Sequence, residues 1–141
     1  IRYAIKGLGT NDDTLIEILC SRTNDELLAA KTAYKRLFKT EMEKDIAGDT
    51  SGDYGRLLIQ MQNASRDPDS TPLDMNKAKQ DSTAVYNAGE KKIGTDEETW
   101  RKIFATRSWP QLNAMFIEYG KTYHKVNYLF FAGTICNLFQ K

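Results

Sequence analysis

Apolar residues recur along this chain three and four positions apart, which is the spacing of one face of an α-helix. Capping and turn residues divide the pattern into segments. We expect helices after Thr10 or Asn11, after Thr23 or Asn24, from Met42 to Ala47, after Gly52, and from Met75 to Gly89. No segment alternates convincingly as a strand would, so the pattern predicts an all-α fold.

The same spacing predicts which side chains face the interior. In the helix after Thr23 the expected apolar face comprises Leu27, Ala30, Tyr34, Leu37 and Phe38. Trp100 and Trp109 are also expected to pack in the core, since large aromatic rings bury much apolar area.

A segment near the start of the chain recurs 85 positions later. The matching pairs include Gly9 with Gly94, Thr10 with Thr95, Asp12 with Glu97, Arg22 with Arg107, and Tyr34 with Tyr119. The register holds without a gap over about 25 residues, so chance is a poor explanation. We therefore expect two helical repeats, one over residues 1–63 and a partial one over 75–141 whose tail diverges from about residue 124. Residues 64–74, with two prolines, are the expected connector.

Composition narrows the function classes. A net charge of +1 argues against nucleic-acid binding. The two cysteines, Cys20 and Cys136, are too few for a disulfide framework and favour a reducing, cytoplasmic compartment. The single histidine, His124, makes a histidine metal site or a Ser-His-Asp arrangement improbable, so we do not expect an enzyme. No signal peptide is visible, and the apolar stretch 126–139 is shorter than the roughly 20 residues of a membrane span.

One loop carries candidate chemistry. Gly7 and Gly9 in IKGLGT allow backbone carbonyls to turn toward one point, and Asp49 follows Gly9 by 40 positions. The carbonyls of Ile5, Gly7 and Gly9 together with the Asp49 carboxylate would offer about five hard oxygens, which suits Ca²⁺ and leaves positions for a lipid phosphate. Taken alone, the loop is better explained as a tight turn between two helices with no ion, and Asp49 can cap the helix after it. The repetition of the loop and its combination with Asp49 favour the ion site.

Three runs resemble the repeats of one known family. IKGLGTNDDTLIEILCSRT, DIAGDTSGDYGRLL and AGEKKIGTDEETWRKIFATRS are similar to annexin repeats, and the resemblance covers roughly residues 1–123. It implies repeats of five short helices (A to E) packed in a curved disc with calcium loops on the convex face. It also implies reversible, calcium-dependent binding to anionic phospholipid membranes. The offset and the connector resemble the junction between the family's second and third repeats. The resemblance thus implies most of a second repeat, without the start of its first helix, followed by part of a third.

The resemblance assigns ligands and lipid contacts. It implies a first calcium site at Ile5, Gly7, Gly9 and Asp49, and a second at Gly89, Lys92 and Gly94. The acid of the second site should fall at position 134, which is Thr134, and no Asp or Glu follows Glu118. The second site is therefore expected to be incomplete. The residues expected to touch lipid are Lys6, Leu8, Thr10 and Ile93.

Two alternatives remain open on the sequence. The missing second acid also suits a calcium-independent helical protein-interaction module that keeps the repeat scaffold. Glu17 and Arg22 match positions that line a polar channel in annexins, although a structural ion pair is the favoured interpretation.

Overall fold

The computed structural model describes residues 1–6, 9–91 and 93–123, and it divides the chain into two compact units. Unit 1 contains Ile1–Ser65, and unit 2 begins at Arg66. All regular secondary structure in these described residues is helical, which confirms the all-α prediction. None of the described helices is long and apolar enough to cross a membrane.

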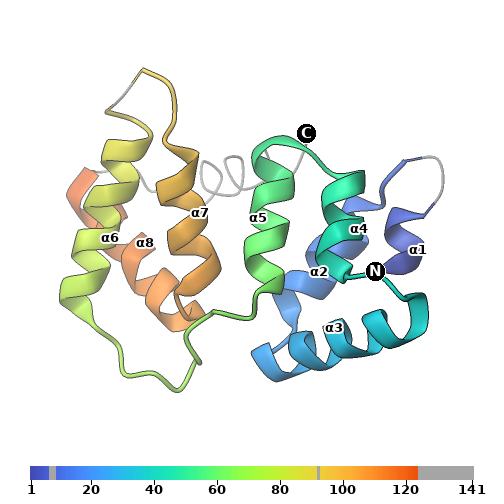
Figure 1. Cartoon of the computed structure of the whole chain (residues 1–141). Helices are drawn as coiled ribbons and strands as arrows, with labels where there is room; N and C mark the ends of the chain where they lie inside the picture. Colours follow the sequence, from blue (N-terminus) through green and yellow to red (C-terminus); the bar gives the residue numbers. More distant parts are fainter. Residues whose placement is uncertain (7–8, 92, 124–141) are drawn as a thin grey trace. The chain divides into compact units, whose positions relative to one another are not determined.

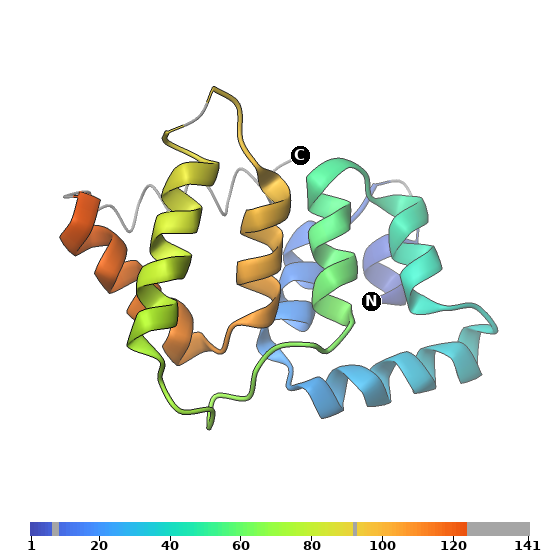
Figure 2. The same ribbon diagram turned by 60° about the vertical axis from the view of Figure 1, so that its left-hand side comes forward.

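The described part of unit 1 contains five helices: α1 (Arg2–Ile5), α2 (Asp12–Ser21), α3 (Asn24–Phe38), α4 (Met42–Asp49) and α5 (Gly52–Gln62). Four of them form a closed ring of contacts, α1 with α2, α2 with α5, α5 with α4, and α4 with α1. Helix α3 lies crosswise beneath α4 and α5 (Figures 1 and 2). Leu15, Ile46 and Leu58 are fully buried within the ring.

Local capping explains where these helices begin. The Asn11 side chain accepts a hydrogen bond from Thr14 N at 3.0 Å, so Asn11 caps α2 as predicted. Thr23 and Glu26 form a capping box at the start of α3. Helix α4 runs two residues further than predicted, to Asp49, because Gly48 keeps a helical conformation and Thr50 N still bonds to Ile46 O at 3.0 Å.

The predicted inner face of α3 is only partly correct. Leu27 and Tyr34 are buried, but Leu37 and Phe38 are 64% and 41% exposed. Since α3 crosses the other helices, only a narrow stripe of its surface is covered. Phe38 instead lies against the Tyr34 ring, with the Arg2 guanidinium 5.4 Å from its centroid.

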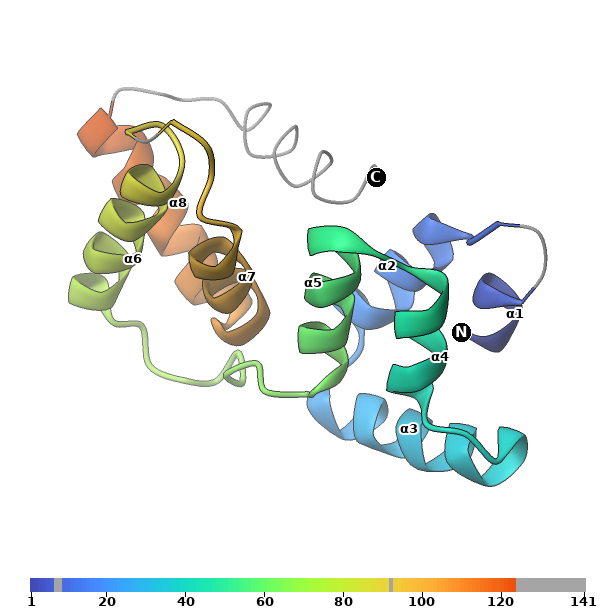
Figure 3. The same ribbon diagram turned by 45° about the horizontal axis from the view of Figure 1, so that its top comes forward.

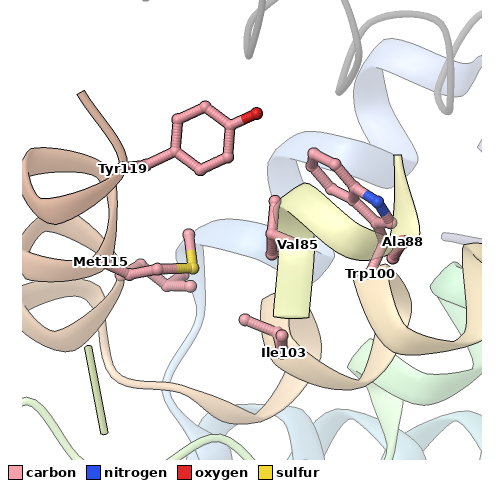
Figure 4. Packing of buried hydrophobic residues seen from close by; sticks show 7 residues of the cluster. Val85, Ala88, Trp100, Ile103, Met115 and Tyr119 are labelled. Atoms are coloured by element: carbon pink, nitrogen blue, oxygen red, sulfur yellow. The ribbon is translucent and has the colours of Figure 1, made fainter. Parts of the chain in front are cut away.

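The described part of unit 2 contains α6 (Met75–Ala88), α7 (Glu97–Thr106) and α8 (Trp109–Tyr123), and Figure 3 shows the three helices packed together. Their core is one apolar cluster, shown in Figure 4, of Val85, Ala88, Trp100, Ile103, Leu112, Met115 and Tyr119. Trp100 is buried as predicted. Trp109 is not, because it is the first residue of α8 and is 47% exposed, with Arg66 stacked 4.3 Å above its ring.

The segment before α6 is fastened to unit 2 by hydrogen bonds. Arg66 donates to the carbonyls of Phe104 and Arg107, which end α7. Asp67 N bonds to Thr106 O at 2.7 Å, and the Asp69 carboxylate accepts from Trp109 N at the start of α8. These residues satisfy exposed helix ends, so the segment from Arg66 onward folds with unit 2.

Two glycines of unit 1 provide a matched stability test. A Cβ added at Gly55 would lie 2.8 Å from Thr50 Oγ1, and Thr50 Oγ1 is held by its bond to Ile46 O. We expect Gly55→Ala to destabilise the protein by about 1–3 kcal/mol because the site is overpacked. Gly48 is also helical but has open space around it, so Gly48→Ala should stabilise by roughly 0.5–1 kcal/mol. Urea denaturation of both variants measures the difference, and equal effects would contradict this account of Gly55.

Candidate calcium-binding site

The loop between α1 and α2 is closed at its base by the backbone. Asn11 N donates to Ala4 O at 2.7 Å. Ile5 ends α1 and is buried, so its carbonyl is among those that a helix end leaves without an intrahelical partner. Gly9 has φ +90°, a conformation that L side chains rarely adopt, and nothing lies within 4 Å of a Cβ added there. Gly7 and Leu8 lie outside the described residues.

The structure brings this loop to the predicted acid. Thr10 Oγ1 donates a hydrogen bond of 3.1 Å to the backbone carbonyl of Asp49, across 39 positions of sequence. Asp49 is the last residue of α4 and its side chain is exposed. Among the described residues, none hydrogen-bonds or ion-pairs with the Asp49 carboxylate, which is therefore available to a ligand.

A second hydrogen bond joins the first turn of α2, just after the loop, to the first turn of α5, just after the end of α4. Tyr54 OH, on α5, donates to Asp12 Oδ1 at 2.8 Å in the first turn of α2. Tyr54 is buried. Its burial, and to a smaller extent its hydrogen bond to Asp12, raise the pKa of the phenol, so the hydroxyl remains a donor at physiological pH. The α1–α2 loop and the α4–α5 turn thus lie at one end of unit 1 (Figure 1).

The available groups match the chemistry of a hard cation. Backbone carbonyls and one carboxylate are oxygen donors, which calcium prefers. The described residues contain no group of three or more His, Cys, Asp or Glu side chains able to hold a metal. The predicted ligand set differs from such a cluster, since it combines main-chain oxygens with one carboxylate.

The second loop, between α6 and α7, is one residue longer than the first. Its base is closed by Asp96 N bonding to Ala88 O at 2.7 Å, so eight positions separate the bonded residues where the first loop has seven. Gly94 repeats the positive φ of Gly9, at +88°. Gly89 directly follows α6 as its C-cap and approaches the Trp100 ring closely, since an added Cβ would lie 3.3 Å from it. Lys92 and Thr134 lie outside the described residues.

The predicted lipid contacts that are described differ in their surroundings. The Ile93 side chain is fully exposed, and Lys6 is exposed as well. Thr10 is half-buried and directs its hydroxyl to Asp49 O within the protein.

Sequence reasoning missed two contacts that hold the loops. One is the Tyr54–Asp12 bond in unit 1; the other is Tyr119 OH, which donates to Glu90 Oε1 at 2.7 Å in the second loop. The apolar spacing of a helix face can mark a tyrosine as a core residue, but it does not identify the partner of the hydroxyl. The partner of a tyrosine hydroxyl has no sequence signature, because it depends on which helices pack together.

The paired arginines of the repeat have different environments. Arg107 forms two hydrogen bonds to the Asp81 carboxylate, at 2.6 and 3.0 Å, and this pair is largely buried. The hydrogen bond to Asp81 raises the pKa of Arg107. Arg22, at the same repeat position, is half-exposed and lies 3.9 Å from Glu26, while Glu17 is exposed. Arg22 thus makes a surface ion pair with Glu26.

Comparison with known proteins decides the family. The Annexin family model matches residues 1–61 and 80–126, which is most of the chain. This chain belongs to the annexin family. It is 44% identical to human annexin A13 and to human annexin A5, in each case over 119 residues that cover 84% of this chain and 37% of the relative. The chain thus spans little more than a third of these annexins.

Solved annexin structures agree with the fold. Annexin III superposes with a TM-score of 0.85 at 40% identity, covering 88% of this chain and 38% of that one. A structure described as calcium-bound annexin (Sm)1 superposes with a TM-score of 0.76 at 28% identity, covering 87% and 39%. The five helices of unit 1 are therefore an annexin repeat.

Proposed function

We propose that this annexin chain binds anionic phospholipid surfaces in a calcium-dependent manner, through the loop and acid of unit 1. The observation that carries the proposal is the hydrogen bond from Thr10 Oγ1 to the main-chain carbonyl of Asp49, which joins a glycine loop to an exposed acidic residue 39 positions away. A relative whose structure is described as calcium-bound supports the choice of ion.

The residues of unit 1 have distinct parts in this proposal. The carbonyls of Ile5, Gly7 and Gly9 and the carboxylate of Asp49 would hold the ion. Bound calcium would supply the positive charge that links these oxygens to a lipid phosphate. Lys6 is exposed beside the loop, where a cation contributes about 1 kcal/mol near an anionic surface. The chain would then lie at the membrane surface rather than cross it.

The affinity should depend strongly on lipid. With a single carboxylate, the proposed site resembles low-charge calcium modules, whose dissociation constants are about 10⁻⁴ to 10⁻³ M. A lipid phosphate that fills the remaining positions adds negative charge and tightens binding. The second loop repeats Gly94 but has no acid after Glu118, so we assign the main activity to the first loop.

Co-sedimentation tests the proposal directly. The 141-residue chain should pellet with phosphatidylserine vesicles in millimolar calcium and return to the supernatant when a chelator is added. Phosphatidylcholine vesicles are the control, because they carry no net charge and should recover little protein. Equal recovery with calcium and with chelator would contradict the proposal.

A second candidate is a calcium-independent helical protein-interaction module on the same scaffold. This candidate is favoured by Thr134, which stands where the family resemblance places the acid of the second site. Calorimetric titration of calcium into the protein with phosphatidylserine vesicles separates the two. A calcium-dependent heat supports lipid binding, and no heat supports the interaction module.

A further inference from the structure

We infer that Thr10 and Tyr54 are positioning residues that hold the loop and the acid of unit 1 in register for calcium. This inference rests on the proposed calcium-dependent function. Two hydrogen bonds together form what we call the clasp. Thr10 Oγ1 donates to Asp49 O at 3.1 Å, and Tyr54 OH donates to Asp12 Oδ1 at 2.8 Å. Neither Thr10 nor Tyr54 belongs to the proposed ligand set, so both would act through the residues they hold.

The acid side of the clasp is a rigid corner. Thr50 follows Asp49 and is bonded to Ile46 O through both its N and its Oγ1, at 3.0 and 2.7 Å. Its side chain also packs directly against Gly55, where a Cβ would be only 2.8 Å away. The end of α4 and the start of α5 are thereby fixed to each other. Asp49 and Tyr54, on either side of this corner, move as one piece.

On the loop side, the residue between Thr10 and Asp12 is also held by further hydrogen bonds. Thr10 precedes the cap residue Asn11, whose N bonds to Ala4 O and whose side chain accepts from Thr14 N. Asp12 is the first residue of α2. The two bonds of the clasp therefore join a closed loop to a rigid corner at neighbouring points, which restricts both sliding and opening.

The hydrogen bonds of the clasp leave the Asp49 carboxylate available to bind calcium. Thr10 bonds to the main-chain carbonyl of Asp49, one of the carbonyls that a helix end leaves without an intrahelical partner. The carboxylate is not used. A site with one carboxylate binds calcium weakly, so the free-energy cost of ordering its ligands matters. If the clasp orders the ligands beforehand, the calcium concentration needed for binding should fall.

The part of the second repeat that the structure describes shows no counterpart of the clasp. Thr95 occupies the position of Thr10, but it is exposed and no described residue accepts a hydrogen bond from its hydroxyl. In the sequence, the positions 85 residues after Asp49 and Tyr54 are Thr134 and Phe139. The copy without the acid thus also lacks the tyrosine hydroxyl, and Thr95 is a matched internal control.

The test uses four single variants of the full chain: Thr10→Val, Thr10→Ser, Tyr54→Phe and Thr95→Val. The first readout is the calcium concentration for half-maximal sedimentation with phosphatidylserine vesicles. Thr10→Val and Tyr54→Phe should each raise it about three- to tenfold, the effect of one lost hydrogen bond. Thr10→Ser keeps the hydroxyl and should stay within about twofold of the parent, as should Thr95→Val.

The second readout needs neither calcium nor lipid. In calcium-free protein, amide hydrogen exchange of Asn11 should be about three- to tenfold faster in Thr10→Val than in the parent, because the loop opens more often. Thr10→Ser should restore slow exchange, and Thr95→Val should leave it unchanged. If exchange becomes faster at Asn11 but not throughout the protein, the loss is that of a local clasp and not of global stability.

The outcomes distinguish this inference from the function on which it rests. A parent that sediments equally with calcium and with chelator overturns both. A parent that sediments only with calcium, together with Thr10→Val and Tyr54→Phe variants that need no more calcium than the parent, overturns the clasp alone. Unchanged Asn11 exchange in Thr10→Val also overturns it.

Discussion

Replacing Asp49 by alanine should raise the calcium concentration for half-maximal binding to phosphatidylserine vesicles by at least about tenfold, which corresponds to about 1.4 kcal/mol. Asp49 is the only carboxylate in the proposed ligand set, so its loss removes the one negatively charged ligand. The residue is exposed and its carboxylate has no partner among the described residues, so the fold should survive. Co-sedimentation across a calcium titration measures the shift, and circular dichroism checks the fold.

Asp25→Ala is the matched control for Asp49→Ala. Asp25 is likewise an exposed acid of unit 1, but it lies in the first turn of α3, away from the loop. Its loss changes the net charge equally and should leave the calcium requirement unchanged. If Asp49→Ala and Asp25→Ala bind alike, the ion is held elsewhere and the proposed bridge is wrong.

Replacing Arg107 by methionine should destabilise unit 2 by about 3 kcal/mol, because it leaves the largely buried Asp81 carboxylate without its bidentate partner. Asp81 is on α6 and Arg107 directly follows α7 as its C-cap, so the pair joins α6 to the end of α7. Urea denaturation followed by tryptophan fluorescence measures the loss, since Trp100 and Trp109 both belong to unit 2.

The repeat supplies the control for this variant too. Arg22→Met alters the same repeat position, but Arg22 is half-exposed and its pair with Glu26 is a surface one, so the change should be within about 0.5 kcal/mol. Replacing both Arg107 and Asp81 by apolar residues should recover part of the loss, because no buried charge is then left unpaired. Equal effects of Arg22→Met and Arg107→Met would contradict the burial argument.

Much of the fold and part of the candidate site could be predicted from the sequence. The caps at Asn11 and Thr23 were predictable because a capping side chain bonds to backbone within three residues. The positive φ of Gly9 and of Gly94 is likewise a local property. The pairing of the loop with Asp49 was also inferred, but only through its spacing and the family resemblance.

Other features depended on packing between helices. Leu37 and Trp109 fit apolar spacings yet are exposed, since α3 lies crosswise and Trp109 begins α8. The second loop has one extra residue between its base and Gly94. The repeat match did not reveal it, because the ungapped register begins only at Gly9 and Gly94. Equal sequence positions therefore did not mean equal geometry.

The sequence by itself determined most of the helices, the caps of α2 and α3, and the family, because these depend on residues a few positions apart or on similarity along the chain. Only the tertiary structure decided the partners of the polar groups. Arg22 and Arg107 are the same residue in the same repeat position, but one pairs at the surface and the other in the interior. Thr10 and Tyr54 likewise gained their partners because α2, α4 and α5 meet at one end of unit 1. Such contacts join residues about 40 positions apart, and three-dimensional packing alone sets them.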